Sequence, residues 1–185
     1  QPVNLKDENF ISHIKKIDPE LIIVVAFRML PKIIWELPKY GTLNLHASLL
    51  PNYRGAAPIN WAIINGEKET GITTFFIDDK IDTGAIILKE KISISDGTTA
   101  GKLHDYLMEK GAILVMKTID TIASKNFILH QQINSENLNS APKLNRENTK
   151  IDWNENDYNI RQLILGLNPF PAAGILLVIQ GISEV

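Results

Sequence analysis

The sequence contains no cysteine among its 185 residues. This absence excludes disulfide bonds, thiol nucleophiles and metal sites with cysteine ligands, and it fits a cytoplasmic protein. An excess of charge of one sign is also lacking, because the formal net charge is only −2. No global electrostatic field therefore draws the chain to nucleic acid or to an anionic membrane, although a local basic patch is still compatible with this charge.

Long hydrophobic runs are absent too. No apolar stretch approaches the roughly 20 residues that a transmembrane helix needs, and the first residues, QPVNLKDENF, lack the pattern of a signal peptide. Neither G-x-G-x-x-G nor the P-loop pattern occurs, so these two phosphate-binding loops are excluded. With 44% hydrophobic residues the chain can form one good core, so we expect a soluble cytoplasmic monomer with one domain or little more.

Hydrophobic patterning predicts an α/β fold. The run LIIVVAF, Leu21 to Phe27, is typical of a strand covered on both faces, as in a mostly parallel sheet flanked by helices. Polar Asn, Ser, Pro and Lys dominate residues 134–150, which we interpret as a linker. Strands are expected at residues 21–27, 43–45, 72–77, 85–94, 127–133 and 174–180, and helices at 9–17, 32–37, 57–65, 98–124 and 153–167.

Two polar residues stand at the end of an expected strand, in the stretch LNLHASLLPNYRGAAPIN. In an extended chain Asn44 and His46 point to the same side, and ligand sites of α/β sheets lie beyond the carboxyl ends of strands. The asparagine amide can stabilise an oxyanion and the histidine can move a proton, so the pair suits chemistry at a carbonyl. The alternative is that both side chains simply satisfy backbone groups at a strand end.

The polar connection DDKIDTG supplies candidate carboxylates. A carboxylate beside His46 would orient the ring and favour its charged form, and we favour Asp82 among these aspartates. The alternative is a purely structural role for Asp82, because Asp and Gly are also ordinary turn residues. The other histidines have no acid or second histidine at a ligand spacing, so no metal site is expected; they are His13, His104 and His130.

The stretch from Asn44 to Leu88 closely resembles the folate-dependent formyltransferases. It contains the pattern N-x-H-x-SLLP-x-YRG followed by D-x-G. In that family the Asn, the His and the Asp are catalytic, and they match Asn44, His46 and Asp82. The resemblance implies the C-terminal portion of a Rossmann-like catalytic domain.

The same resemblance implies a cofactor and its binding residues. The family's formyl donor is 10-formyltetrahydrofolate, and no metal takes part. By resemblance, two segments and one aspartate would bind the folate: Phe27, Arg28, Met29 and Leu30; Ser48, Leu49, Leu50 and Pro51; and Asp78.

The acceptor amine is inferred from two further motifs. GAAPINWA and the later APKLNRENTKIDW with GLNPFPAA look like the branch that formylates initiator methionyl-tRNA. We therefore expect a catalytic domain at residues 1–133, a linker at 134–150 and the start of a C-terminal domain at 151–185. Family members also have an N-terminal stretch before this region and a C-terminal barrel of the OB type, which we expect this chain to lack. The alternatives are formylation of a sugar-nucleotide or glycinamide ribonucleotide amine, and an inactive fragment that binds folate or tRNA.

Overall fold

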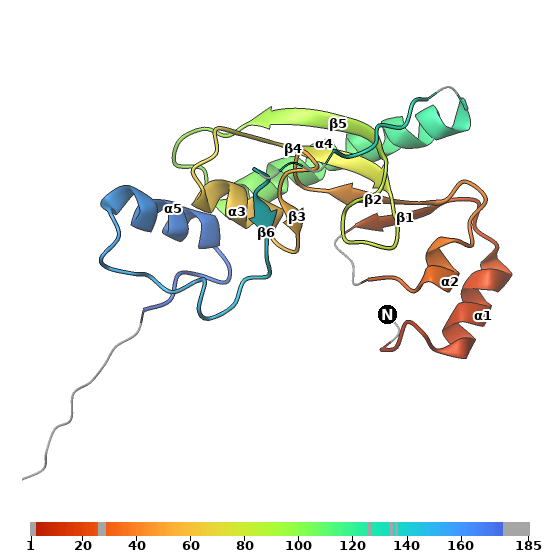
Figure 1. The fold of residues 1–185 in the computed structure, drawn as a ribbon, viewed down its shortest axis with the longest axis horizontal. Helices are drawn as coiled ribbons and strands as arrows, with labels where there is room; N and C mark the ends of the chain where they lie inside the picture. Colours follow the sequence, from red (N-terminus) through yellow and green to blue (C-terminus); the bar gives the residue numbers. More distant parts are fainter. Residues whose placement is uncertain (1–2, 26–28, 126, 134, 136, 176–185) are drawn as a thin grey trace, which may run out of the picture.

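The computed structural model describes residues 3–25, 29–125, 127–133, 135 and 137–175, and it has the expected α/β architecture (Figure 1). Its elements are α1 (Glu8–Ile17), β1 (Ile22–Val25), α2 (Lys32–Trp35), β2 (Thr42–His46), β3 (Arg54–Gly55), α3 (Pro58–Ile64), β4 (Glu69–Phe76), β5 (Ile86–Ser93), α4 (Ala100–Ala123), β6 (Ser140–Ala141) and α5 (Asp157–Leu167).

The main sheet is mixed and has the strand order β1-β2-β4-β5. β1 and β2 pair in parallel, whereas β2 with β4 and β4 with β5 are antiparallel pairs. The polar connection between β4 and β5 contains Asp82, and it leaves the sheet near the strand that contains His46.

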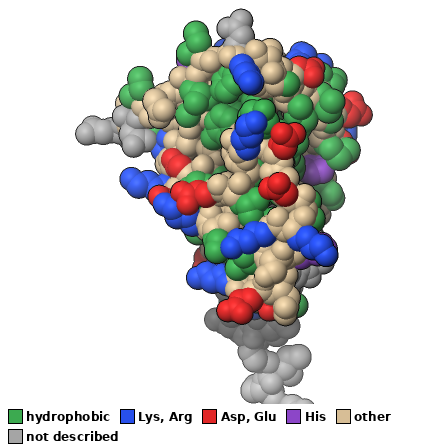
Figure 2. All heavy atoms as spheres, turned by 90° about the vertical axis from the view of Figure 1, so that its right-hand side faces the viewer, with side chains coloured by type: hydrophobic (Ala, Val, Ile, Leu, Met, Phe, Trp, Pro, Cys, Tyr) green, Lys and Arg blue, Asp and Glu red, His purple; other side chains and the backbone are tan. Residues whose placement is uncertain are grey.

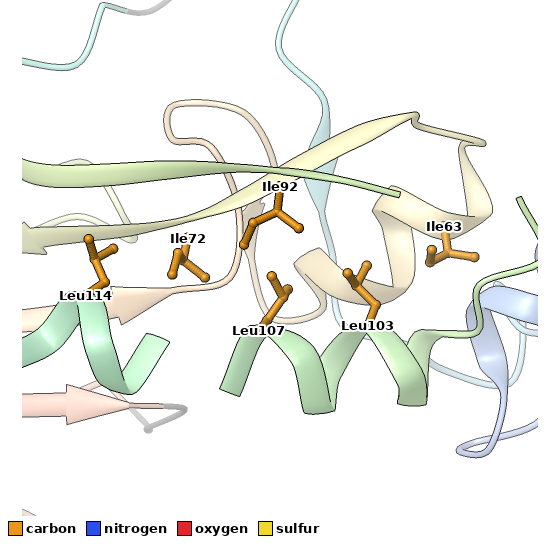
Figure 3. Packing of buried hydrophobic residues seen from close by; sticks show 6 residues of the cluster. All are labelled: Ile63, Ile72, Ile92, Leu103, Leu107 and Leu114. Atoms are coloured by element: carbon orange, nitrogen blue, oxygen red, sulfur yellow. The ribbon is translucent and has the colours of Figure 1, made fainter. Parts of the chain in front are cut away.

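Helix α4 covers one face of this sheet. The side chain of Thr99 caps it by accepting from the Lys102 N–H, and the buried side of the helix then carries Leu103, Leu107 and Leu114. Figure 3 shows this apolar core, which consists of Ile63, Ile72, Ile92, Leu103, Leu107 and Leu114.

The opposite face of β2 carries the polar residues. Leu43 and Leu45 pack into the hydrophobic clusters on the α4 side. Because side chains alternate along a strand, Asn44 and His46 point to the other face. There they lie opposite Phe75 and Thr73 of β4. The five residues of β2 therefore contribute leucines to the core on one face of the sheet and candidate site residues on the other.

A second, two-stranded sheet joins segments that are distant in sequence. β3 pairs in parallel with β6, with Arg54 opposite Ser140 and Gly55 opposite Ala141. The expected linker thus contains a short strand that the sequence did not indicate. Two side-chain hydrogen bonds also tie α3 to α5, from Asn60 to Gly166 O at 2.7 Å and from Gln162 to Ile63 O at 2.9 Å. The domain boundaries remain predictions.

Several expected elements differ in the structure. The strand expected at residues 127–133 is wrong in the described part, where only His130 forms an isolated bridge, with Ile86. Helix α5 begins at Asp157 and not at residue 153, because Asn156 caps it by accepting from the Asn159 N–H. Residues 26 and 27 of the first expected strand and 176–180 of the last lie outside the described residues.

Strand β1 is an edge of the main sheet and is incompletely covered. Ile23 and Val25 are 40% and 55% exposed. Beside them, between α1, β1 and α2, lies an apolar groove of about 360 Å³. On this side of the molecule, Figure 2 shows basic and acidic side chains intermixed, without a large area of one sign among the described residues. In the described ranges, no helix has both the length and the apolar character needed to cross a membrane.

Candidate active site

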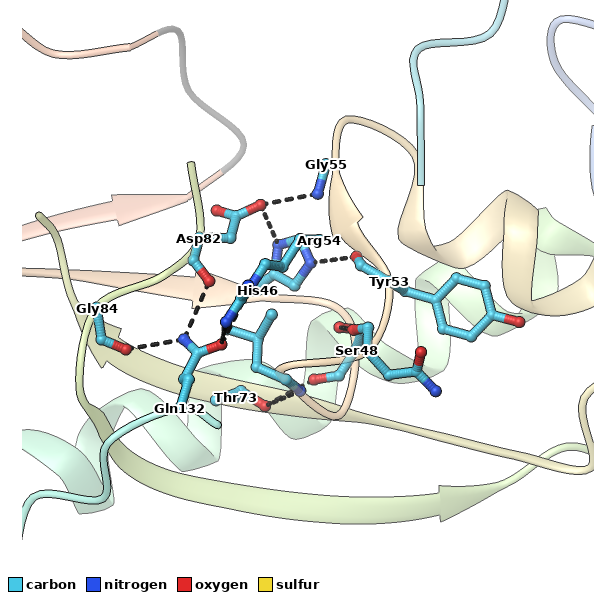
Figure 4. A network of polar contacts seen from close by, with 11 residues as sticks. His46, Ser48, Tyr53, Arg54, Gly55, Thr73, Asp82, Gly84 and Gln132 are labelled. Carbon is cyan, nitrogen blue, oxygen red and sulfur yellow. Dashed lines mark hydrogen bonds and ion pairs between the residues drawn. The ribbon is translucent and has the colours of Figure 1, made fainter. Parts of the chain in front are cut away.

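His46 lies at the end of β2 with only 6% of its surface exposed, and both of its ring nitrogens face oxygen atoms (Figure 4). Nε2 is 2.8 Å from the main-chain oxygen of Tyr53, and Nδ1 is 3.7 Å from Oδ2 of Asp82. A carbonyl oxygen can only accept, so Nε2 is the nitrogen that donates. The separation of 3.7 Å is too long for a hydrogen bond, so Nδ1 faces the Asp82 carboxylate without bonding to it directly.

Asp82 is held toward the ring by the backbone on both sides of the site. The backbone of Asp82 adopts a left-handed conformation with φ of 54°, and the side-chain Oδ2 accepts from the Gly55 N–H at 2.9 Å. Nearby, the Thr83 hydroxyl donates to Asp78 at 2.7 Å, which braces the same loop. A side chain at Gly84 would bring its Cβ into the Phe76 carbonyl oxygen, so only glycine allows this course of the loop. The structure therefore brings Asp82 and His46 together.

Asn44 contributes an unpaired acceptor on the same face of β2 as His46. Its Oδ1 is buried and has no hydrogen-bond partner among the described residues. Buried polar atoms are almost always hydrogen-bonded, so an orphaned oxygen at a strand end is consistent with a site where a ligand N–H completes the pairing.

Of the first segment expected to bind folate, the structure describes only Met29 and Leu30. Phe27 and Arg28 fall outside the described residues, while Met29 is 72% exposed and Leu30 is half-buried. Their contacts with folate remain predictions.

The second expected folate-binding segment mainly supports the turn after β2. The hydroxyl of Ser48 is turned inward and donates to Asn52 O at 2.6 Å, and Leu50 packs into a small core cluster. Leu49 and Pro51 are half-buried. Folate binding by this segment likewise remains a prediction.

Comparison with known proteins identifies the family. Residues 1–119 match the formyl transferase family. The chain belongs to this family. It is 58% identical over 177 residues to the methionyl-tRNA formyltransferase of Flavobacterium johnsoniae, an alignment that covers 96% of this chain and 56% of the relative. This formyl transferase chain therefore spans about half the length of the curated relatives that it matches.

Solved structures of other proteins have the same fold. The N-formyltransferase of Helicobacter canadensis, in complex with folinic acid and dTDP-3-aminofucose, matches with a TM-score of 0.65 at 29% identity, over 76% of this chain and 52% of that one. HypX from Aquifex aeolicus, in complex with tetrahydrofolic acid, matches with a TM-score of 0.75 over 89% of this chain and 28% of that one. At 20% identity, this second likeness shows the fold alone.

Two residues that the sequence did not mark as functional complete the surroundings of His46 in this formyl transferase. Tyr53 supplies the carbonyl oxygen for Nε2 from a left-handed conformation with φ of 59°. Its phenol donates to Glu67 at 2.6 Å. The pKa of Tyr53 is raised to about 12, and burial is the largest cause and this hydrogen bond the second. The neutral phenol is therefore a fixed anchor for the turn that presents the carbonyl.

The second of these residues is Gln132, which follows α4 and lies against the Asp82 loop (Figure 4). Its amide nitrogen donates to the main-chain oxygens of Asp82 and Gly84. No motif surrounds Gln132 in the sequence, so only its position in the fold reveals it.

Proposed function

We propose that this chain transfers the formyl group of 10-formyltetrahydrofolate to the α-amino group of initiator methionyl-tRNA, in the cytoplasm, for translation initiation. The observation that carries the proposal is the closeness of His46 Nδ1 and Asp82 Oδ2, whose largely buried side chains lie 3.7 Å apart in a chain 58% identical to a methionyl-tRNA formyltransferase. Because the chain spans about half of that relative, activity, acceptor and partner are all inferred.

The site contains the groups that acyl transfer to an amine requires. The amine nitrogen forms a bond to the formyl carbon, the bond from that carbon to the donor nitrogen breaks, and one proton moves from the amine to the leaving nitrogen. In this proposal Nδ1 of His46 takes that proton and returns it, while the Asp82 carboxylate stabilises the charged ring. The Tyr53 carbonyl occupies the other ring nitrogen, which supports Nδ1 as the atom that exchanges the proton.

Asn44 has the second role, at the formyl oxygen or the attacking amine. Its amide nitrogen can donate to the oxygen where negative charge develops, and its buried Oδ1 can accept from an N–H of the bound substrates. The unpaired state of Oδ1 among the described residues supports a ligand at this position. The donor would lie along residues 27–30, the turn at 48–51 and the Asp78 loop, as the family resemblance implies.

The test is a formylation assay with labelled 10-formyltetrahydrofolate and three acceptors in parallel. These are initiator methionyl-tRNA, an amino-sugar nucleotide and glycinamide ribonucleotide. Transfer to the tRNA is expected. Turnover of the amino-sugar nucleotide alone would reject the tRNA and favour an amino-sugar acceptor of the kind bound to the Helicobacter canadensis protein, dTDP-3-aminofucose.

A second candidate is a chain that binds folate or tRNA without chemistry. Asn44 Oδ1, which has no hydrogen-bond partner in the part of the chain that the structure describes, is compatible with it, because that oxygen can accept from a bound ligand whether or not transfer follows. Equilibrium dialysis with tetrahydrofolate separates the two candidates. Folate binding without transfer to any of the three acceptors would support the binding role, whereas transfer rejects it.

A further inference from the structure

Gln132 joins the two turns that surround the His46 ring. Its amide nitrogen donates to Asp82 O at 3.0 Å and to Gly84 O at 2.8 Å. Its amide oxygen accepts from Arg54, at 3.1 Å from Nε and 2.6 Å from the second terminal nitrogen of the guanidinium. One half-buried side chain thus uses both of its ends, one on the β4–β5 loop and one on β3.

These contacts close a ring of interactions around the Asp82 carboxylate. Gly55, which directly follows Arg54, donates its N–H to Asp82 Oδ2 at 2.9 Å. The carboxylate is therefore fixed from the β3 side, and the main chain of the same residue is fixed by Gln132. Because Arg54 ties Gln132 back to β3, the two turns cannot separate without breaking hydrogen bonds on at least one side of Asp82.

We propose that Gln132 is a positioning residue that acts through Asp82 and holds its carboxylate beside Nδ1 of His46. Gln132 donates to the main-chain oxygen of Asp82, and the Asp82 carboxylate is the group that faces the ring. The inference rests on the proposed function, because its kinetic consequence depends on Asp82 acting with His46.

The chemistry of the amide explains why glutamine is suited to this position. The Asp82 and Gly84 carbonyls need a donor, whereas the Arg54 guanidinium needs an acceptor. Glutamate would satisfy Arg54 but present a carboxylate to two carbonyl oxygens. Leucine would leave both turns without their shared partner.

The experiment compares variants of the 185-residue chain in the formylation assay. In Gln132→Leu and in Gln132→Glu we expect kcat to fall by up to about 100-fold, because a displacement of about 1 Å has this effect, with the KM for the folate little changed. Adding Gln132→Leu to Asp82→Asn should lower kcat little further, since residues that act as a unit are not additive. Gln131→Leu is the matched control, because Gln131 is the exposed neighbour.

Two kinetic outcomes would overturn the proposal. If Gln132→Glu had the same kcat as the Gln131→Leu control, the hydrogen bonds to Asp82 and Gly84 would be unnecessary and only the Arg54 contact would matter. A full additional loss on the Asp82→Asn background would show that Gln132 does not act through Asp82.

Amide hydrogen exchange provides a measurement that does not depend on catalysis. Gln132→Leu should expose the Gly55 N–H, which is bonded to Asp82, to faster exchange, while core amides stay protected and Gln131→Leu has no effect. Unchanged Gly55 protection would overturn the positioning role. A wild-type chain that transfers no formyl group refutes the proposed function instead, and the exchange result then decides the inference alone.

Discussion

His46 and Asp82 lie with Nδ1 and Oδ2 3.7 Å apart, although His46 is the last residue of β2 and Asp82 lies in the loop between β4 and β5. The side chain of His46 is 7% exposed and that of Asp82 is 12% exposed, so water screens their interaction only weakly. The role of the Asp82 carboxylate beside the ring can be tested without changing the shape of the site.

Asp82→Asn removes the charge and keeps the shape. The new side-chain oxygen can still accept from the Gly55 N–H, so the loop should hold its course. We expect kcat to fall by about 10²- to 10⁴-fold, the range that general acid–base catalysis contributes, because the ring charged in the proton transfer loses its carboxylate. The control is Asp79→Asn in the same loop, where the side chain is 71% exposed and pairs only with Lys32 in the described structure. Equal losses in both variants would reject a special role for Asp82.

Asn44→Ala should separate activity from stability. The side-chain oxygen has no partner among the described residues, so its removal breaks no hydrogen bond that the structure shows there. The rate should nevertheless fall by about 10²- to 10³-fold, as for loss of an oxyanion donor. Kinetics and urea unfolding would be measured on the same samples.

Asn60→Ala is the opposite control for this experiment. Asn60 donates to Gly166 O at 2.7 Å and joins α3 to α5, away from His46. The Asn60→Ala variant should have a lower midpoint of urea unfolding and an unchanged kcat. An Asn44→Ala chain with wild-type kcat would remove Asn44 from the mechanism.

Thr74 and Thr118 form a buried hydroxyl pair between β4 and α4, with oxygens 2.8 Å apart and no exposed surface. Thr118 also donates to Leu114 O, so Thr118→Val removes the nearest partner of the Thr74 hydroxyl. We expect a loss of about 1 to 3 kcal/mol in the free energy of unfolding, whereas the double change to valine should recover much of it. Urea denaturation would measure both. Thr121→Val, on the outer side of α4, is the control.

Tyr53 should make stability depend on alkaline pH. Its pKa is raised from 10.0 to about 12 in the folded chain, first by burial and then by the hydrogen bond to Glu67. As pH rises, the unfolded chain loses the phenol proton before the folded chain does. The contribution of Tyr53 to the free energy of unfolding is therefore fully present below pH 10 and falls by about 2 to 3 kcal/mol as pH rises toward 12. Unfolding free energies of wild type and Tyr53→Phe, measured across this range, should converge as pH rises. Parallel curves would contradict the shift.

The sequence alone predicted the elements that depend on local patterning. Helix α4 follows from apolar spacing and a capping threonine, and the common side of Asn44 and His46 follows from strand alternation. The motif that begins at Asn44 also indicated the family correctly. These features depend on residues close together in the chain, where backbone geometry and side-chain periodicity leave few alternatives.

The tertiary structure alone decided which distant groups surround the histidine. The Gly55 N–H on Asp82, the Tyr53 carbonyl on His46 and the Gln132 bridge all arise from turns whose course depends on packing. The pairing of β6 with β3 likewise placed part of an expected linker beside the site. A single hydrogen bond between distant segments leaves no periodic pattern in a sequence, so the amino acids specify these contacts only through the folded chain.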